Sequence, residues 1–314
     1  MSHYLVTGGC GFIGSHLCDA LVAGGDKVTV LDNLSTGRVE NVPHGCRIVI
    51  GDVQDRIAVL EAMTGVDGCF HLAAIASVDR GNRDWIGTHA ANQTGTVTVL
   101  DVARHGCGGM PVPVVYASSA AVYGNPAILP APEDAPLRPT SAYGADKLGS
   151  ELHARVAGSV HGVPTLGLRF FNVYGPRQDP TSPYSGVISI FADRLRRRLP
   201  LTLHGDGQQV RDFVYVSDVV HHLIAGMDRA SPQADVFNVC TGRCTTIREL
   251  AHAAACLLAV DPDLRFGPAR PGDIRVSVGS PRRAIEALGV SANVGLEEGL
   301  AHLLGIGHRL AAAA

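Results

Sequence analysis

Lysine is almost absent from this sequence. Of its 26 basic residues only Lys27 and Lys147 are lysines, and the others are arginines. Basic residues are also outnumbered by 29 acidic ones, which leaves a formal net charge of −3 at pH 7. A weakly acidic chain is not built to neutralise a nucleic-acid backbone, so nucleic acid is excluded as an expected partner. The scarcity of lysine makes both lysines worth inspecting.

The sequence also lacks the usual marks of secreted, membrane and metal-binding chains. Its start has no basic segment followed by an apolar stretch, so we expect no signal peptide. The longest uncharged stretch, residues 106–132, is interrupted by proline and glycine and does not predict a membrane helix. Eight cysteines form no Cys-x-x-Cys pair, which favours reduced thiols over disulfides or a metal site. We therefore expect a cytoplasmic protein without a membrane partner or a bound metal.

Short apolar runs alternate with helical patterns through the first half of the 314 residues. This alternation predicts an α/β fold with a doubly wound parallel sheet, covered by helices on both faces. The regularity loosens later, so we expect a first domain at residues 1–170, to which later strands return, and a smaller C-terminal α/β lobe at residues 171–314. The expected strands are 3–7, 27–31, 47–50, 68–72, 113–117, 165–171, 201–203, 210–214 and 236–239. The expected helices are 12–23, 56–63, 85–105, 143–160, 187–198, 216–228, 247–258, 281–288 and 296–304.

A glycine-rich turn joins the first expected strand to the first helix. Gly8, Gly11 and Gly14 are spaced three apart, where they allow a tight turn, close approach of a pyrophosphate and close helix packing. Asp32 ends the second strand, where a carboxylate accepts the ribose 2′-hydroxyl of a dinucleotide. It would repel a 2′-phosphate, which favours NAD over NADP, although Arg38 nearby could serve that phosphate. The pattern predicts a Rossmann domain that binds NAD.

A second motif carries acid–base chemistry. Tyr143 and Lys147 are four residues apart in a helical pattern, which places them on one helix face. A free tyrosine has a pKa near ~10, and a neighbouring ammonium lowers it. Ser119 follows the fifth strand, at the sheet edge where ligands of parallel sheets bind. We expect Ser119, Tyr143 and Lys147 to be catalytic, with Ser119 and Tyr143 also contacting substrate.

Taken together, these motifs give the sequence a clear family likeness. It resembles the extended short-chain dehydrogenase/reductases, in their nucleotide-sugar epimerase/dehydratase branch. The matching segments occur in order over most of the chain. They are Thr7–Gly14, Asp32–Gly37, Gly51–Val53, His71–Ala74, Ser118–Gly124, Tyr143–Lys147, Arg169–Gly175, Arg211–Asp218 and Arg270–Asp273.

The resemblance implies a full set of cofactor and substrate contacts. Those to NAD are Gly8, Gly11, Phe12, Ile13, Gly14, Asp32, Asn33, Ser35, Thr36, Gly37, Asp52, Val53, Leu72, Ala73, Ala74, Ala76, Asn92, Tyr143, Lys147 and Phe170. Those to a UDP-sugar, besides Ser119 and Tyr143, are Asn172, Val187, Arg211, Arg270 and Asp273. Arg211 and Arg270 would grip the diphosphate, and Asp273 a ribose hydroxyl. The resemblance also implies a homodimer, formed by helices 85–105 and 143–160.

The segment after Ser119 distinguishes among the reactions of the branch. Family dehydratases carry an Asp-Glu pair there and decarboxylases a Glu, whereas this chain has Ala120 and Ala121. Without a carboxylate for those proton transfers, the resemblance implies 4-epimerisation of a UDP-sugar of the UDP-glucose/UDP-galactose type. The alternatives are a UDP-glucuronate or UDP-N-acetylglucosamine 4-epimerase, a dehydratase with a different acid, and a non-catalytic NAD(H)-binding regulator.

Two further residues bear on the width of the sugar pocket. In similar epimerases a residue shortly after Arg-Pro-Gly-Asp helps to wall the sugar, and here that position is Ser277. A serine leaves more room than a tyrosine, so we expect larger sugars to be tolerated. A uronate would need a cation near C6, for which Arg80 is the candidate. The alternative is that Ser277 faces elsewhere and that Arg80 is solvated.

Overall fold

The computed structural model describes residues 1–106, 109–179, 186–269 and 273–306. Its largest element is a seven-stranded sheet in the order β11-β6-β5-β4-β1-β2-β3. Every neighbouring pair in this sheet is parallel. The strands are β1 (His3–Thr7), β2 (Lys27–Asp32), β3 (Arg47–Ile50), β4 (Gly68–His71), β5 (Val114–Ser119), β6 (Thr165–Phe170) and β11 (Asp235–Val239).

Helices cover both faces of this sheet because successive strand residues alternate between two cores. Val6 of β1 packs in one core with α1 (Phe12–Ala23), α8 (Val216–Met227) and α10 (Arg282–Leu288). Leu5, the residue before it, packs in the other core. That second core includes residues of α2 (Arg56–Met63), α5 (Gly95–Ala103) and α6 (Ala142–His161). The predicted doubly wound fold is confirmed, with β11 returning from late in the chain.

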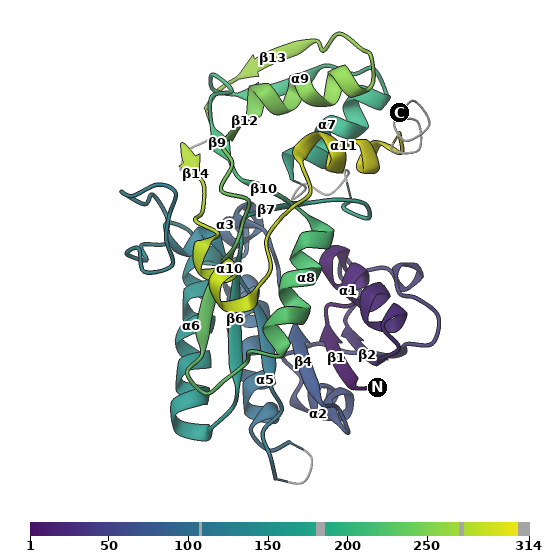
Figure 1. The fold of residues 1–314 in the computed structure, drawn as a ribbon, viewed down its shortest axis with the longest axis vertical. Coiled ribbons are helices and arrows are strands. Elements are labelled where there is room, and N and C mark those ends of the chain that lie inside the picture. The colour runs from purple at the N-terminus through teal and green to yellow at the C-terminus, as the bar shows by residue number, and fades with distance from the viewer. Residues whose placement is uncertain (107–108, 180–185, 270–272, 307–314) are drawn as a thin grey trace.

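The remaining elements form a smaller part above the carboxyl ends of the strands (Figure 1). Its strands form three small sheets, β10-β7, β12-β9-β14 and β13-β8. A third core joins two of them, β10-β7 and β13-β8, to the helices of this part. The strands are β7 (Asn172–Tyr174), β8 (Leu201–His204), β9 (Val210–Arg211), β10 (Phe213–Tyr215), β12 (Thr245–Thr246), β13 (Leu264–Gly267) and β14 (Val276–Ser277). The helices are α7 (Val187–Arg196), α9 (Ile247–Leu257) and α11 (Leu296–Leu304).

Two expected elements are divided in the structure. In place of one helix over 85–105 there are α4 (Trp85–His89), a π-helical turn (Ala90–Thr94) and α5, preceded by a short helix α3 (Val78–Arg83). The π-helical turn carries Asn92, whose side chain hydrogen-bonds both backbone groups of Ile75. The change in helical winding thus coincides with a tertiary contact. π-Helical turns are frequent at functional sites.

The expected strand 210–214 divides at Asp212. Residues before it pair with β12 and β14, while residues after it pair with β7 in a different sheet. The buried Asp212 carboxylate accepts hydrogen bonds from the backbone of Thr241, Gly242 and Gly279. These bonds hold the chain where it passes from one small sheet to the other.

Membrane helices, metal sites and disulfides are three features that the sequence does not predict. None of the described helices is long and apolar enough to cross a membrane. No group of three or more metal-ligating side chains gathers within the described ranges. The seven described cysteines are all free thiols.

Candidate active site

The glycine-rich turn after β1 forms a cradle at the N-terminus of α1. Gly8 has φ +71°, and a Cβ there would come within 2.8 Å of the Ala73 nitrogen. A Cβ on Gly14 would collide with the Gly8 carbonyl, whereas one on Gly11 would meet only that oxygen, at 3.2 Å. The α1 N-terminus has no side-chain cap and no acid in its first turn. Its N–H groups therefore suit a bound phosphate.

Asp32 lies beside this cradle, at the carboxyl end of β2. Its side chain is buried and accepts the backbone N–H of Cys10 at 3.0 Å and that of Leu34 at 2.8 Å. A Cβ at Gly37 would come within 3.0 Å of both carboxylate oxygens, so this glycine allows the loop to pass close by. Asp32 thus joins the glycine turn to the loop after β2, where the 2′-hydroxyl of a dinucleotide would lie.

The loop after β2 is bonded to a second acidic residue, Asp52, which follows β3. Asn33 donates a hydrogen bond to Asp52 at 2.8 Å and accepts the Ser35 N–H at 3.0 Å. Burial raises the pKa of Asp52, but hydrogen bonds from Gln54 and Asn33 outweigh it and lower the pKa overall. The neighbouring Val53 is buried against Gly95. Asp52 and Val53 therefore lie beside the loop that contains Asn33, Ser35, Thr36 and Gly37.

Arg38 follows that loop and lies near a carboxylate. Its guanidinium is 3.8 Å from the carboxylate of Asp179, and both side chains are largely exposed. An exposed ion pair of this length contributes little, so the preference for NAD rests on Asp32 and not on Arg38.

The loop after β4 is held by Thr7 and His71. The Thr7 hydroxyl accepts the N–H groups of Leu72 and Ala73, each at 3.2 Å, and contacts Nδ1 of His71 at 2.8 Å. The His71 Nε2 contacts the Thr96 hydroxyl at 3.1 Å. Burial, together with the charge of Lys147, lowers the pKa of His71 to about 3, so the ring is neutral. His71 fixes the loop rather than exchanging protons.

The rest of that loop and the end of β6 complete the set predicted to contact NAD. Asn92 supports the loop through its two hydrogen bonds to Ile75. Ala74 is half-buried and Ala76 is exposed. Phe170 is buried at the end of β6, beside the ends of β5 and β11.

Ser119, Tyr143 and Lys147 come together at the carboxyl end of β5. Ser141 caps α6 by accepting the Gly144 N–H at 3.1 Å, which places Tyr143 in the first turn of the helix. The Ser119 side chain lies next to the Tyr143 hydroxyl and lowers its pKa. One turn later, buried Lys147 donates from Nζ to the Ala117 carbonyl at 2.9 Å. Its Nζ lies 5.8 Å from the centroid of the Tyr143 ring.

The electrostatics of this group differ in one respect from the expectation. Burial lowers the pKa of Lys147 to about 8, against an opposing effect of Asp146. Burial raises the pKa of Tyr143, and the group that lowers it is Ser119 rather than the Lys147 ammonium. Burial therefore has the largest effect on the pKa of Tyr143, and Ser119 on β5 opposes it.

The residues predicted to bind the nucleotide lie in the smaller part. Arg211 donates two Nη1 hydrogen bonds to the carbonyls of Val210 and Ile274, at 2.9 and 2.7 Å, and pairs through Nη2 with Asp273 at 2.5 Å. Within the described residues this uses three of the five guanidinium N–H groups and leaves two for phosphate oxygens. The position predicted for a second arginine, Arg270, falls outside the described residues.

Asn172 and Ser277 are brought together by the backbone of Asp212. The Asp212 carbonyl accepts the Asn172 N–H at 3.0 Å, and the Asp212 N–H donates to the Ser277 carbonyl at 2.9 Å. Ser277 lies opposite Arg211 in the β14–β9 ladder. Three residues predicted to contact substrate thus surround one buried aspartate.

Arg80 lies on α3, next to the start of α6, and Val187 begins α7. Arg80 is half-buried on α3, whose Gly81 lies next to the start of α6: a Cβ there would be 3.6 Å from the Tyr143 nitrogen. Val187 is the half-buried first residue of α7 and packs against the core of the smaller part.

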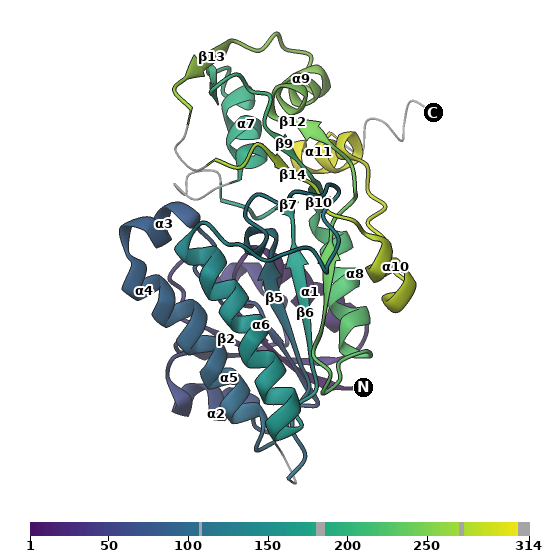
Figure 2. The same ribbon diagram turned by 90° about the vertical axis from the view of Figure 1, so that its left-hand side faces the viewer.

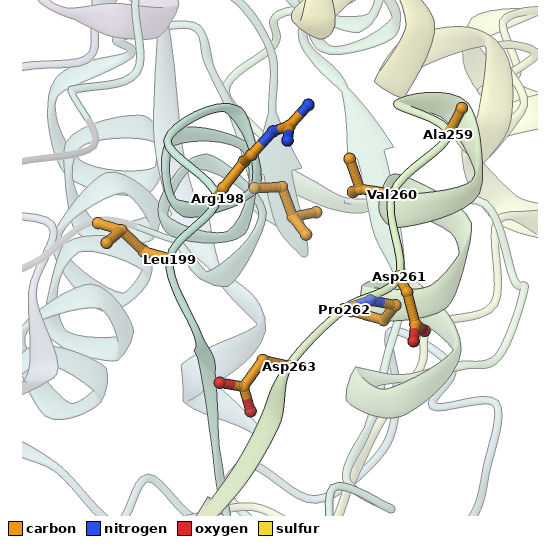
Figure 3. A pocket seen from close by; sticks show the side chains of 8 residues that line it. Arg198, Leu199, Ala259, Val260, Asp261, Pro262 and Asp263 are labelled. Carbon is orange, nitrogen blue, oxygen red and sulfur yellow. The ribbon is translucent and has the colours of Figure 1, made fainter.

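A separate hollow lies away from all these residues. Its volume is about 290 Å³, and it is enclosed by the end of α7 and the turn after α9. Figure 3 shows Arg198, Asp261 and Asp263 around it. No residue predicted to bind NAD or substrate lines it, so we do not take it as the active site. Its lining residues are Leu195, Arg198, Leu199, Ala259, Val260, Asp261, Pro262 and Asp263.

Comparison with known proteins identifies related chains over the full length of this sequence. The sequence model of the NAD dependent epimerase/dehydratase family matches residues 4–240. A UDP-glucose 4-epimerase of Mycolicibacterium smegmatis is 38% identical over 305 residues, which cover 95% of this chain and 96% of the relative.

Solved structures share the fold at similar identity. The UDP-glucose 4-epimerase of Thermotoga maritima, solved with UDP-glucose, superposes with a TM-score of 0.92 at 34% identity, covering 98% of this chain and 99% of its own. The UDP-N-acetylglucosamine 4-epimerase of Methanobrevibacter ruminantium, in complex with UDP-N-acetylmuramic acid, superposes with a TM-score of 0.91 at 32% identity and the same coverage.

Proposed function

Because this chain belongs to the NAD dependent epimerase/dehydratase family, we propose that it is a 4-epimerase that interconverts UDP-glucose and UDP-galactose with NAD bound. The observation that carries the proposal is the grouping of Tyr143 with Ser119, which lowers its pKa against the effect of burial, and with the buried Lys147 one helical turn away. A module that only binds NAD(H) has no need of a tyrosine, a serine and a lysine grouped in this way, which disfavours the alternative of a non-catalytic regulator.

The turn after Ser119 favours epimerisation within the family. It is a short helical turn, Ala120–Val122, that carries no carboxylate. A dehydratase must protonate the 6-hydroxyl that leaves as water, and no residue of this turn can do so. A 4-keto sugar formed here can only take back the hydride at C4 and the proton at O4. If the keto sugar first rotates in the site, the hydride returns to the opposite face and C4 is inverted.

The glycine cradle, with its uncapped helix N-terminus, fits a dinucleotide. Bound NAD would accept the C4 hydride and later return it. Tyr143 would take the proton of the 4-hydroxyl, and Ser119 would hold the oxygen from which it leaves. Lys147 would hold the cofactor and, as the ammonium, stabilise the negative charge that forms on Tyr143.

The smaller part would hold the nucleotide. We assign the diphosphate to Arg211 and Arg270 and a ribose hydroxyl to Asp273. The two unused N–H groups of Arg211 are the support, since a guanidinium pairs well with phosphate oxygens. On this basis residues 1–170 form the NAD-binding domain and 171–314 mainly the nucleotide-sugar lobe. The free thiols agree with a reducing, cytoplasmic setting.

Two measurements on the purified protein test this function. Small molecules released by heat should contain NAD(H) and not NADP(H), since the cycle never exchanges the cofactor. Incubation with UDP-glucose, UDP-galactose, UDP-N-acetylglucosamine and UDP-glucuronate, followed by chromatography, should show interconversion at C4. Bound NADP(H) would refute the role of Asp32, and a 4-keto-6-deoxy product would establish the dehydratase instead.

Ser277→Tyr tests the width of the sugar pocket. If Ser277 walls the pocket, the added ring excludes an N-acetyl group, so kcat/KM for UDP-N-acetylglucosamine should fall at least about tenfold more than that for UDP-glucose. Steady-state kinetics on the two substrates give this ratio. Equal losses on both substrates would show that Ser277 does not wall the sugar pocket. Tolerance of an N-acetyl sugar would then not depend on this position.

We also propose that the chain forms a homodimer through α4, α5 and α6. These helices lie side by side on one flank of the molecule (Figure 2). Large apolar side chains are exposed along that flank, more than a lone soluble chain usually presents together. They are Trp85 at 68% exposure, Ile86 at 86%, Val97 at 37%, Leu152 at 51%, Val156 at 49% and Val160 at 67%.

Val156→Glu should therefore convert a dimer to a monomer. A carboxylate on the apolar flank would be desolvated twice in a symmetric interface, once in each copy. Light scattering after size exclusion gives the mass. The matched control is Ile285→Glu, an apolar helix residue with 44% exposure on α10, outside that flank, and it should leave the mass unchanged. A wild-type monomer would contradict the proposal.

A further inference from the structure

We propose that Glu151 and Arg169 are positioning residues that hold α6 against β5 and β6, so that Ser119 and Tyr143 stay in register. This inference rests on the proposed function and deepens it, because it names what aligns the reacting hydroxyls. Glu151 was not among the residues predicted from the sequence. The signal was nevertheless present, since Glu151 continues the four-residue spacing of Tyr143 and Lys147 by one further helical turn.

The centre of this arrangement is a buried ion pair. The side chains of Arg169 and Glu151 are only 5% and 2% exposed. Arg169 donates from Nε to Glu151 Oε1 at 2.9 Å and from Nη2 to Oε2 at 2.8 Å. Both carboxylate oxygens are therefore held by one planar guanidinium, which fixes the direction of the side chain as well as its position.

The same carboxylate reaches the strand that carries Ser119. The Ser118 hydroxyl donates to Glu151 Oε1 at 2.5 Å. Ser118 is the residue directly before Ser119, and Lys147, one turn before Glu151, donates to the carbonyl of Ala117 in the same strand. Two successive turns of α6 are thus bonded to two consecutive residues of β5, Ala117 and Ser118.

Arg169 is anchored on its other side. Its Nη1 donates at 2.8 Å both to the Tyr123 hydroxyl and to the Glu133 carbonyl. The Tyr123 hydroxyl in turn donates to the Asn238 side chain at 2.7 Å. The guanidinium carbon lies 4.8 Å from the centroid of the Tyr123 ring. Arg169 therefore cannot follow α6 if that helix moves, and the pair ties the helix to the sheet.

A buried ion pair is seldom kept for stability alone, because desolvation offsets most of the attraction between its charges. Geometric specificity is a better reason for this pair. Apolar side chains would let α6 slide or rotate slightly on the sheet, whereas the charged contacts allow one register. Ser119 on β5 and Tyr143 on α6 face each other across this same interface, and Ser119 is the group that lowers the pKa of Tyr143. Loosening the interface should therefore raise that pKa.

Glu151→Gln and Ser118→Ala test the inference. Glu151→Gln removes the charge at nearly constant volume. Ser118→Ala keeps the ion pair and removes only the hydrogen bond between Ser118 and Glu151. The matched control is Glu61→Gln, which breaks an ion pair with Arg47 of similar length, 2.7 Å, whose side chains are half exposed. Each protein is also prepared with Tyr143→Phe added, and both forms are titrated to alkaline pH. The difference in phenolate absorbance between the two forms reports the titration of Tyr143 alone.

The expected result is a Tyr143 titration shifted to higher pH in both variants and unshifted in Glu61→Gln. For UDP-glucose, kcat should fall about tenfold or more while KM stays within about twofold, because the substrate contacts remain. Folded variants with an unshifted titration would overturn the inference. If Glu151→Gln fails to fold, Ser118→Ala decides it. A wild-type chain inactive on every UDP-sugar would refute the proposed function, while the titration would still decide the positioning role.

Discussion

Tyr143→Phe should lower kcat by about 10²- to 10⁴-fold while KM for the UDP-sugar changes little. The substitution removes one hydroxyl and keeps the ring, so packing against the start of α6 is preserved. In the proposed function the Tyr143 phenolate accepts the proton from the sugar 4-hydroxyl, and no other group of the described cluster is placed to do so. Ser119 has an ordinary alcohol without a base beside it, and His71 is neutral and bonded at both nitrogens.

The split between kcat and KM is the informative part of this experiment. A loss confined to kcat places the hydroxyl in the transition state, whereas an equal change in KM would assign it to ground-state binding. The assay is best run below pH 8, because burial lowers the pKa of Lys147 to about 8 and the ammonium is lost above that value. Ser141→Ala, which removes the α6 cap but no reacting group, serves as the control for helix disturbance.

Near-normal turnover by Tyr143→Phe would show that the cluster has been misassigned. The conclusion would then extend to Ser119 and Lys147, since both are assigned through their contacts with the tyrosine.

The second large effect is expected at the glycine cradle, where two substitutions should fail in different ways. Gly11→Ala should fold normally but lose about tenfold or more in NAD affinity, because its Cβ meets only the Gly8 carbonyl, at 3.2 Å, and otherwise occupies the space for a phosphate. Gly14→Ala should instead lower the Tm of the chain, because its Cβ would collide with the backbone of Gly8 and come within 2.8 Å of Gly9 Cα.

Two measurements separate these outcomes: thermal unfolding of the NAD-free chain, and the NAD(H) content and affinity of each variant. Gly295→Ala is a close control for Gly11→Ala, since both glycines precede a helix without a side-chain cap and have negative φ values. Nothing lies within 4 Å of a Cβ at Gly295. If Gly11→Ala bound NAD as tightly as the control, the phosphates would not lie over this turn.

The dinucleotide domain was predictable from the sequence because each of its signals is local. The strands are mostly apolar, the glycines lie within one turn, and Tyr143 and Lys147 are one helical turn apart. Such patterns follow from the periods of strand and helix, which hold wherever the element lies in the fold. For the same reason the helix limits Val216–Met227 and Leu296–Leu304 agree with the expected ones within a residue.

Contacts between distant segments were decided only by the tertiary structure. Arg211 and Asp273 are 62 residues apart, and neither residue type shows that the two pair with each other. Asp212 divides an apparent strand because its carboxylate binds a loop 29 residues away. The strands Thr245–Thr246 and Val276–Ser277 are too short to have a period and exist because β9 lies between them.

The acidity of Tyr143 shows the same division. From the sequence alone its partner was Lys147, the neighbour on the helix. The structure adds burial, which raises the pKa, and Ser119, which lowers it from a strand 24 residues earlier in the chain. Helical spacing determines which side chains share a face. Only the packing of α6 on the sheet determines what that face meets, and therefore which groups set the charge of the tyrosine.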